Sequence, residues 1–318
     1  MNSERIQTKM AHDVAQGLAA QPKYISSRYF YDAQGDKLFQ QIMNMPEYYP
    51  TTCEFEIFES YKEKLLDYLP EREWDLVELG AGDGRKTKVL LEHFLQQQSR
   101  FAYFPIDISG AVLHHLEQDL AKTLPQLRVK TLNYEYFHAL EELNKMDQNP
   151  RLVLFLGGNI GNFKPAEALS FYQSLQAVLR PGDLLLNGID LRKNPLTILE
   201  AYNDKTGITR DFNLNLLTRF NRELGANFNT KNFQHYPTYN PVSGEALSYL
   251  MSTCEQEVFI EKLGQTFHFA ANEPIHTEVS QKYSFAEIET LAQKTGFALV
   301  EHFTDAKGWF CDSLWRKI

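Results

Sequence analysis

The sequence predicts an α/β fold: a doubly wound, mostly parallel sheet that ends in an antiparallel hairpin, with a second, discontinuous α+β lobe. Three observations predict it. Strand-like apolar runs alternate with helical patterns over residues 74–192. A glycine-rich turn joins the first of these strands to its helix. Two β-type runs, 298–304 and 309–316, flank the turn Asp305-Ala306-Lys307-Gly308, as a hairpin requires.

The elements of the sheet follow in order along the chain. Thr51 and Glu54 have the spacing of a capping box, which predicts a helix up to about Leu69. Ser284 and Glu287 repeat that spacing before the last helix, which Gly296 should end. The strands are expected at 76–79, 101–107, 127–132, 152–156 and 183–189, and the helices from 86, from 109, at 166–179 and at 285–295. The run 152–156 is wholly apolar, as a strand buried on both faces should be.

Two stretches lie outside this pattern, residues 1–70 and residues 193–283. The second has helical patterns at 195–203 and 209–224, then β-type runs at 247–261 and 265–270 that turn at Gly264. We therefore expect residues 71–192 and 284–318 to form the sheet domain. The other two stretches should form one discontinuous lobe over the carboxyl ends of the strands, where open α/β sheets bind ligands. A second ligand should bind between the lobes.

The turn after the first strand indicates a nucleotide cofactor. Gly80, Gly82 and Gly84 follow Glu78 at every second position. Glycines let the backbone pass close to a ligand and adopt positive φ without steric cost. A dinucleotide loop, G-x-G-x-x-G, would need glycine where Arg85 stands. The E-x-G-x-G-x-G pattern is instead typical of S-adenosylmethionine (SAM) sites. An ordinary glycine-rich turn is the simpler alternative.

An acidic residue at the end of the next strand supports the same interpretation. Asp107 ends the run FAYFPID, 29 residues after Glu78. A carboxylate there accepts hydrogen bonds from both ribose hydroxyls and so selects an unphosphorylated ribose. The alternative is that Asp107 is the N-cap of the helix from Ser109. Taken together, the glycines and the acid favour SAM over a nicotinamide cofactor.

Composition excludes several classes of function. The chain has 318 residues, 43% of them apolar, with 41 acidic against 32 basic residues. A net charge of −9 argues against a nucleic-acid footprint. Neither a secretory signal nor an apolar membrane-spanning run is visible. Three widely spaced cysteines fit a reducing cytoplasm. His114, His115 and His276 lack metal-ligand spacing, so no metal is expected. The oligomeric state stays open, with a monomer favoured.

Many segments resemble the histidine Nα-methyltransferases, SAM enzymes that make trimethylhistidine (hercynine) on the route to ergothioneine. The matching segments span nearly the whole chain in order: YDAQGDKLFQQI (31–42), PEYYPT (46–51), ELGAGDGRKT (78–87), YFPIDIS (103–109), FLGGNIGNF (155–163), NGIDLRKNP (187–195), AYND (201–204), FNLNLL (212–217), NRELGANF (221–228) and TEVSQKYS (277–284). The resemblance implies a Rossmann-like methyltransferase sheet and a small-molecule substrate, L-histidine.

The resemblance also implies roles for particular residues. The cofactor-binding residues would be Gly80, Gly82, Lys86, Asp107, Asn133 and Tyr134, although the family usually has Asp-Phe where this chain has Asn133-Tyr134. The substrate-binding residues would be Tyr48, Gly157, Asn162, Tyr202, Met251, Glu278 and Ser280. Tyr31 and Phe39 would position the amino group. No catalytic residue is assigned.

One pair of these residues also has a physical rationale. Glu278 and Ser280 are two apart, so on a strand they share a face and can grip both nitrogens of an imidazole. An exposed carboxylate and hydroxyl on an edge strand would be the alternative. Methylation of another aromatic amino acid, such as a tryptophan derivative, SAM binding without turnover, and a nicotinamide-dependent oxidoreductase are the rival functions.

Overall fold

The computed structural model of the protein describes residues 3–146 and 148–318. The chain divides into two compact units, each made from two separate stretches. Unit 1 comprises Met1–Tyr49 and Lys193–Gln281, and unit 2 comprises Pro50–Arg192 and Lys282–Ile318. The sequence had placed the boundaries after residues 70, 192 and 283; the structural division falls after residues 49, 192 and 281. The helix α3 (Tyr49–Leu66) therefore lies almost entirely in unit 2.

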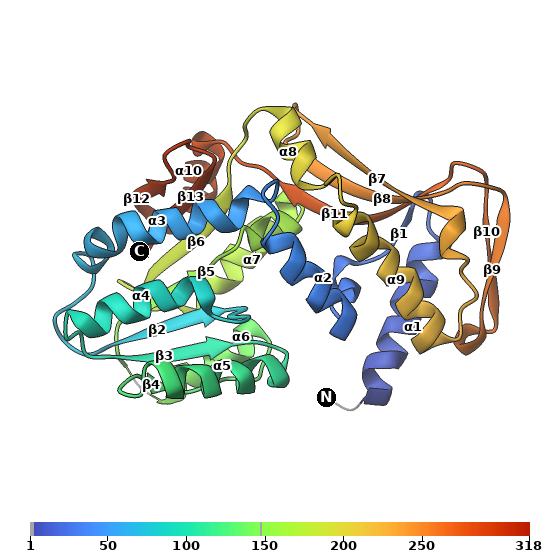
Figure 1. Ribbon diagram of the computed structural model, residues 1–318. Helices are drawn as coiled ribbons and strands as arrows, with labels where there is room; N and C mark the ends of the chain where they lie inside the picture. The colour runs from blue at the N-terminus through green and yellow to red at the C-terminus, as the bar shows by residue number, and fades with distance from the viewer. Residues whose placement is uncertain (1–2, 147) are drawn as a thin grey trace. The chain divides into compact units, whose positions relative to one another are not determined.

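Unit 2 is built on a seven-stranded sheet. Its strands are β2 (Trp74–Leu79), β3 (Phe101–Ile106), β4 (Arg128–Val129), β5 (Arg151–Phe155), β6 (Leu184–Asp190), β12 (Phe297–Thr304) and β13 (Phe310–Lys317). They lie side by side in the order β12-β13-β6-β5-β2-β3-β4 (Figure 1). The strands from β2 to β6 pair in parallel, and β13 is antiparallel to both β6 and β12. The predicted parallel sheet with a C-terminal antiparallel hairpin is confirmed.

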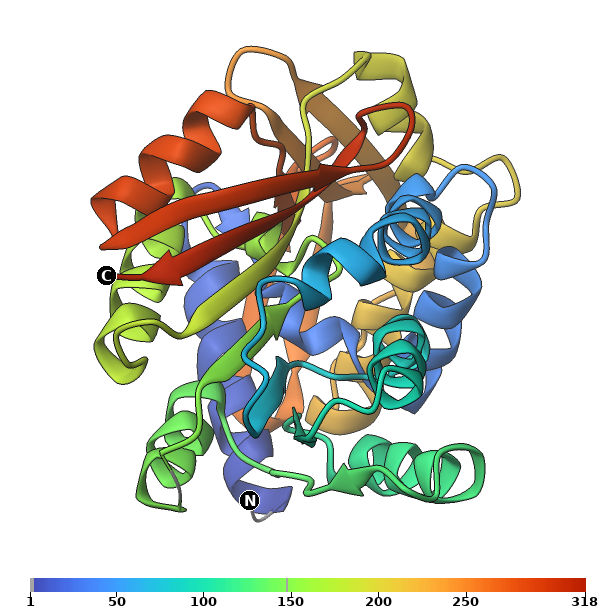
Figure 2. The same ribbon diagram turned by 90° about the vertical axis from the view of Figure 1, so that its left-hand side faces the viewer.

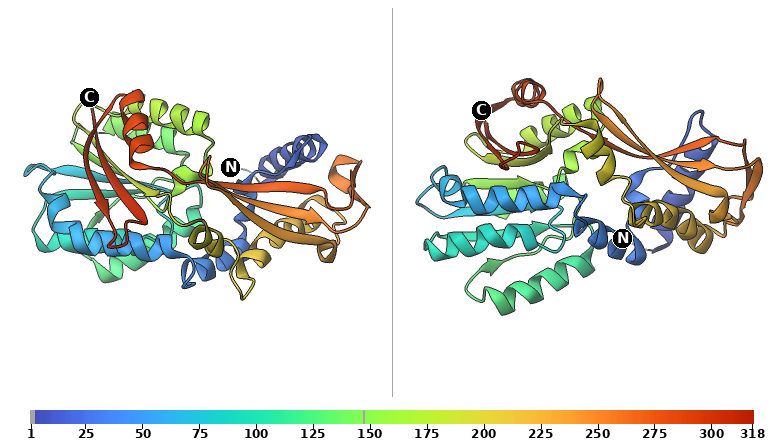
Figure 3. Two further views of the ribbon diagram at one scale, coloured as in Figure 1. Left: turned by 90° about the horizontal axis from the view of Figure 1, so that it is seen from above. Right: turned by 45° about the horizontal axis from the view of Figure 1, so that its top comes forward.

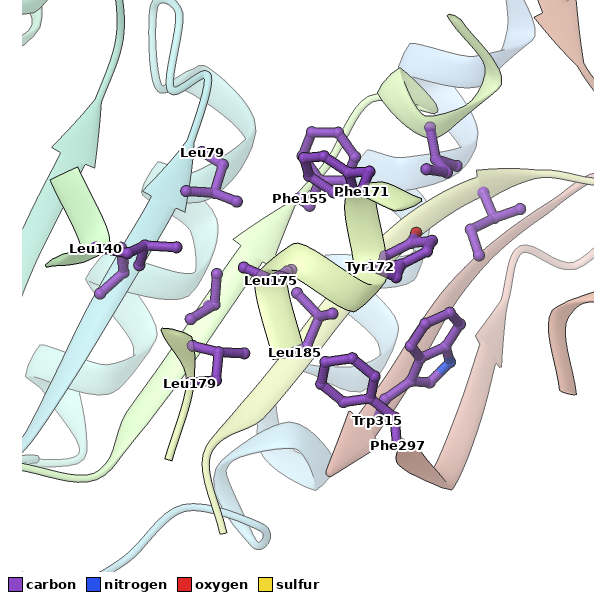
Figure 4. Packing of buried hydrophobic residues seen from close by; sticks show 14 of the residues in the cluster. Leu79, Leu140, Phe155, Phe171, Tyr172, Leu175, Leu179, Leu185, Phe297 and Trp315 are labelled. Carbon is purple, nitrogen blue, oxygen red and sulfur yellow. The ribbon is translucent and has the colours of Figure 1, made fainter. Parts of the chain in front are cut away.

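Helices cover both faces of this sheet. On one face lie α3, α4 (Arg85–Gln96) and α5 (Gly110–Thr123) (Figure 2). On the other lie α6 (Tyr136–Met146), α7 (Pro165–Val178) and α10 (Phe285–Lys294). Four consecutive residues of β5, from Leu152 to Phe155, are 0% exposed, because side chains of a central strand are covered from both sides. Between β5 and α7, aromatic and aliphatic side chains interdigitate (Figure 4).

Unit 1 combines helices with a second sheet. Its helices are α1 (Ser3–Ala19), α2 (Ala33–Met43), α8 (Pro195–Ala201) and α9 (Ile208–Leu224). Its four-stranded sheet has the order β1 (Lys23–Tyr24), β11 (Pro274–Gln281), β8 (Glu245–Ser252) and β7 (Phe233–Asn240), and β9 (Gln256–Ile260) pairs with β10 (Gln265–Phe269). Figure 3 shows β7, β8 and β11 as long neighbouring strands. Phe212, Leu216 and Phe220 of α9 share a core with Leu250 and Ile275 of the sheet.

Three predicted elements differ from the structure. Helix α3 begins at Tyr49, so Thr51 and Glu54 lie inside it and form no capping box. The strand expected over 127–132 shrinks to β4, with Leu132 making a single bridge to Ile106. The run 247–261 is two strands, β8 and β9, separated at the polar segment 253–255.

The strand β7 was not predicted from the sequence. β7 contains Pro237 and several polar residues, and therefore has no clear strand signature. It nevertheless pairs with β8 along eight residues, from Phe233 opposite Ser252 to Asn240 opposite Glu245.

Candidate active site

The glycine turn lies at the carboxyl end of β2 in unit 2. Its three glycines meet different steric constraints. All three have positive φ: 74° at Gly80, 55° at Gly82 and 65° at Gly84. A Cβ on Gly80 would lie 2.8 Å from the Tyr136 hydroxyl, and one on Gly84 would lie 2.5 Å from a methyl of Leu116. A Cβ on Gly82 would meet nothing within 4 Å. The backbone at Gly82 is therefore open to close approach by a ligand.

Asp107 lies beside this turn, at the end of β3. Its Oδ2 accepts a hydrogen bond from the Gly82 amide at 3.3 Å, and its Oδ1 accepts one from the Ser109 amide at 2.8 Å. The N-cap of α5 is Ser109, whose hydroxyl accepts from the Val112 amide. Asp107 is thus not the helix cap. Its carboxylate is oriented toward the loop that the sequence associated with a nucleotide.

Asn133 and Tyr134 follow the β4 region at the same edge of the sheet. The Asn133 side-chain amide donates to the Asp107 carbonyl at 2.9 Å, which leaves its Oδ1 to act as an acceptor next to Gly110. The Tyr134 amide donates to the Leu132 carbonyl at 3.1 Å. The Tyr134 side chain is 41% exposed and its ring lies 4.6 Å from that of His138.

Lys86 is held by a carboxylate that the sequence had assigned to helix capping. Glu54 of α3 is 0% exposed and forms an ion pair with the Lys86 ammonium. Its other oxygen accepts from the Gly157 amide at 2.7 Å. A Cβ on Gly188 would lie 2.2 Å from that same oxygen, so only glycine there admits Glu54. Glu54 therefore ties α4 to the ends of β5 and β6.

Two further acids in unit 2 are buried near this ion pair. Asp312 lies opposite Gly188 in the β13–β6 ladder and is 0% exposed. Burial, and then the neighbouring charge of Glu54, raise the pKa of Asp312 well above its usual value. Burial also raises the pKa of Glu78 to about 7, although hydrogen bonds from Thr87 and Tyr103 oppose the rise. Neutral carboxylic acids are thus favoured beside the charged pair.

In unit 1, Glu278 and Ser280 lie on β11, which pairs with β8 along its length and with the two-residue β1 only at Ile275 and His276. No irregularity separates them in the ladder, so the two side chains share a face as the spacing predicted. Glu278 is paired with Ser248 and Ser280 with Ala246. The Ser248 hydroxyl donates to the Glu278 carboxylate at 3.4 Å. Ser280 is only 8% exposed, which rules out the exposed edge-strand alternative.

Met251 is not brought to the Glu278 face. Side chains alternate along β8, so Ser248 and Leu250 face the core of unit 1. Met251 lies on the other face of the strand, where it pairs with Pro274. Ser248 is the residue of β8 that contacts Glu278. Sequence reasoning missed it because only the strand register shows which residue lies opposite.

Three predicted aromatic residues, Tyr31, Phe39 and Tyr48, form a cluster in unit 1 that Phe212 joins. The Phe39 ring lies 5.6 Å from Tyr31 and 6.4 Å from Tyr48, edge to face in both cases. Phe212 of α9 lies 6.0 Å from both Tyr31 and Phe39. Tyr31 remains 45% exposed. The aromatic set is therefore preassembled on a packed core, with one ring presented at the surface.

The remaining candidates lie at the ends of elements. In unit 2, Asn162 is exposed at the end of the short 3₁₀ helix Asn159–Asn162, which directly follows Gly157 and Gly158. In unit 1, Tyr202 is the C-cap residue of α8, and its amide donates to the Leu199 carbonyl at 3.1 Å.

Comparison with known proteins identifies the family. The model of a family described as "Histidine-specific methyltransferase, SAM-dependent" matches residues 10–317. The chain belongs to this family.

Individual relatives agree with this assignment. A histidine N-alpha-methyltransferase of Mycobacterium tuberculosis is 33% identical over 97% of this chain and 95% of the relative. Ergothioneine biosynthesis protein 1 of Schizosaccharomyces pombe is 30% identical over 88% of this chain and 37% of that longer protein. An L-tryptophan methyltransferase of Psilocybe serbica is more distant, at 26% identity over 94% of this chain and 90% of the relative.

The residues of this histidine-specific methyltransferase fit the cofactor of its family. The open backbone at Gly82, the Asp107 carboxylate beside it and the Asn133 Oδ1 supply a close approach, a hydroxyl acceptor and an amine acceptor at one edge of the sheet. These are the groups that a nucleoside with free ribose hydroxyls and an exocyclic amine requires. The enzyme is a SAM-dependent N-methyltransferase.

Two kinds of feature are absent from the described residues, 3–146 and 148–318. They contain no group of three or more His, Cys, Asp or Glu side chains suited to holding a metal ion. None of the helices they form is long and apolar enough to cross a membrane.

Proposed function

We propose that the enzyme transfers methyl groups from SAM to the α-amino nitrogen of L-histidine, three times in succession, to give the trimethyl betaine. The observation that carries the proposal is the Glu278–Ser280 pair on one face of β11, within a chain whose family is histidine-specific. A carboxylate accepts from one imidazole nitrogen, and a hydroxyl donates to or accepts from the other. An indole has one nitrogen and would leave one of these polar groups unpaired.

On the cofactor side, we assign the ribose to Asp107 and the adenine amine to Asn133. Gly80 and Gly82 let the chain pass close to the ligand. The family resemblance assigns Lys86 to the SAM site, but its ammonium is already paired with the buried Glu54. We infer that Lys86 and Gly157 form part of the wall of the cofactor site, and that neighbouring residues bind the cofactor directly.

On the substrate side, we assign Asn162 and Tyr202 to the histidine carboxylate, and Tyr48 to the region of the imidazole. Tyr31 and Phe39 would surround the amino group. The faces of aromatic rings attract a quaternary ammonium ion by about 0.5–2 kcal/mol, which suits a product bearing three methyl groups. The aromatic cluster around Phe212 keeps these rings in place while the amine changes size.

The chemistry makes modest demands on the protein. SAM supplies a methyl group activated by its sulfonium, and in-line displacement needs no covalent enzyme intermediate. The protein must hold the amine lone pair on the line of attack and exclude water, so orientation contributes much of the rate. An α-amino group titrates near ~8, so removing its proton at neutral pH costs on the order of 1–2 kcal/mol. Binding in the correct orientation, rather than a strong base, is the main requirement.

One experiment tests the reaction. Purified protein is incubated with SAM and the twenty amino acids, and the mixture is followed by mass spectrometry. We expect histidine alone to gain one, two and then three methyl masses, with a matching yield of S-adenosylhomocysteine. Methylated tryptophan in place of histidine would favour the activity of the more distant relative. SAM binding without S-adenosylhomocysteine would mean that the protein is not an active enzyme.

We propose that the trimethyl product serves ergothioneine formation, because a similar protein of Schizosaccharomyces pombe is an ergothioneine biosynthesis protein. A cytoplasmic location and a monomeric state remain predictions from the sequence.

A further inference from the structure

A β-bulge lies immediately before Glu278. In the β11–β8 ladder, His276 pairs with Tyr249 and Glu278 pairs with Ser248, so Thr277 is an extra residue on β11. Such an insertion shifts the alternation of side chains by one position. With regular alternation from the core residue Ile275, Glu278 would point away from the core face. With the bulge, Glu278 shares that face with Ile275.

The bulge is held by buried hydrogen bonds to helix α9. The Thr277 hydroxyl lies 3.0 Å from the Asn213 Oδ1 and 3.0 Å from the Ser248 carbonyl. The Asn213 side-chain amide donates to the Thr209 carbonyl one turn earlier in α9, at 3.0 Å. Thr277 and Ser248 are 1% exposed and Asn213 is 0% exposed. The cluster is thus a dry polar connection between the helix and the bulge.

Ser248 joins both residues of the bulge. Its carbonyl shares the single Thr277 hydroxyl proton with the Asn213 Oδ1, and its own hydroxyl donates to the Glu278 carboxylate. Polar groups buried against an apolar core are costly unless they are paired, and an apolar trio would pack here without that cost. Apolar residues do fill the neighbouring pair on the same face, Ile275 and Leu250, each 0% exposed. The polar cluster therefore needs a reason other than stability.

We propose that Asn213, Thr277 and Ser248 are positioning residues: the first two fix the bulge that turns Glu278 to the inner face, and Ser248 orients its carboxylate toward the imidazole of histidine. This inference rests on the proposed function, because it assigns the device to recognition of the histidine ring. Ser248 acts through Glu278, and its hydroxyl has no direct role in methyl transfer.

The first test compares two buried serines of the same strand. Ser248→Ala should raise KM for histidine about tenfold, because a hydrogen bond to a charged acceptor is lost, with kcat and the calorimetric Kd for SAM little changed. Ser252→Ala is the matched control, since Ser252 is 0% exposed on the same face and its hydroxyl donates to the Cys254 carbonyl. The control should leave KM unchanged. Equal KM values in the two variants would overturn the proposal.

The bulge is tested by a pair of substitutions at one position. Thr277→Val keeps the shape of the side chain and removes the hydroxyl, and should raise KM for histidine about tenfold. Thr277→Ser restores the hydroxyl and should recover most of the loss. If the serine variant behaves like the valine variant, packing rather than hydrogen bonding is responsible, and the assigned role of Thr277 is wrong.

A double-mutant cycle separates this inference from the proposed function. In a Glu278→Gln background, Ser248→Ala should have almost no further effect on the Kd for histidine, because its partner charge is gone. A full tenfold effect in that background would contradict action through Glu278. If Glu278→Gln alone leaves histidine binding unchanged, the assignment of Glu278 to the ring fails. If Glu278→Gln weakens binding but Ser248→Ala does not, only the positioning role fails.

Discussion

The two units present their candidate ligand-binding groups by different structural means. In unit 2, Gly82, Asp107 and Asn133 lie where neighbouring parallel strands end, and backbone hydrogen bonds fix the turn that carries them: the amides of Gly80 and Ala81 both donate to the Ile106 carbonyl. In unit 1, Glu278 lies within a strand, and its direction depends on a bulge and on buried side-chain contacts. The first arrangement follows from topology, and the second depends on individual side chains.

This difference suggests why one family can keep its cofactor while its substrate varies. A site made by strand ends tolerates changes in the side chains around it, because the backbone positions its groups. A site made by a side-chain network changes its preference when one member is replaced. We therefore expect substitutions in the Glu278 network of unit 1 to alter amino-acid recognition and leave SAM binding unchanged. Substitutions at Gly82, Asp107 and Asn133 of unit 2 should do the reverse.

The largest effect should come from Glu278→Ala. The imidazole N–H loses its charged acceptor, and a site built for a polar group rejects a partner that it cannot pair, so kcat/KM for histidine should fall on the order of a thousandfold. The Kd for SAM, measured by calorimetry, should not change. A variant that loses SAM affinity as well would show that the two units do not act separately.

A stability experiment on Glu78 should give the next largest effect. Its pKa rises from the usual 4.5 to about 7 in the folded protein. Between these pH values the folded state holds a proton that the unfolded state has released, so this group lowers the free energy of unfolding as pH rises. The free energy of unfolding should be lower by about 3 kcal/mol at pH 8 than at pH 4, because each pKa unit corresponds to about 1.36 kcal/mol.

Glu78→Gln mimics the protonated acid and should remove this dependence. The difference in unfolding free energy between variant and wild type, measured by urea denaturation, should grow in favour of the variant from pH 5 to pH 8. A difference that stays constant across this range would mean that Glu78 does not titrate in it.

A smaller effect is expected for Asp107→Ala in unit 2. Loss of a carboxylate that accepts from the ribose hydroxyls should weaken SAM binding about thirtyfold. KM for histidine at saturating SAM should stay close to the wild-type value. Asp119→Ala is a suitable control, since Asp119 is an exposed acid of the same unit, paired with Lys88. Unchanged SAM affinity in Asp107→Ala would remove this residue from the ribose site.

An effect of similar size concerns His235, a residue of β7 in unit 1 that is 8% exposed. Burial lowers its pKa from 6.5 to about 4, despite the opposing charge of Asp204. Below pH 6.5 the unfolded chain takes up a proton that the folded state refuses, so stability falls on acidification, by about 2 kcal/mol at pH 5. His235→Leu should remove this loss, as measured by thermal unfolding at pH 5 and pH 7. An equal acid loss in the variant would assign it to other groups.

The sequence predicted unit 2 well because its signals are local. The glycine spacing, the acid at the end of β3 and the apolar run of β5 each report on the residues that carry them, and the structure agrees with all three. Glu54 was misread because a capping box and a buried ion pair require the same residue type. Only its three-dimensional neighbours, Lys86 and Gly157, distinguish them.

Unit 1 was less predictable for a physical reason. The candidate site of unit 1 depends on which residues lie opposite each other in neighbouring strands. A one-residue bulge changes this strand register, and no local sequence pattern reveals it. The shared face of Glu278 and Ser280 followed from their spacing, but the direction of that face depends on Thr277. Likewise, neither Ser248, which contacts Glu278, nor Phe212, which joins the aromatic cluster, was predicted.

The order of the strands in unit 2 has a consequence for synthesis in the cell. β13 is the latest of the seven strands in the chain, yet it lies inside the sheet between β12 and β6. Until β13, residues 310–317, has left the ribosome, β6 lacks its antiparallel neighbour and remains an open edge of the sheet. Exposed apolar edges invite wrong pairing in nascent chains. We expect newly made chains of this enzyme to depend on chaperones up to that point, and truncations before it to aggregate.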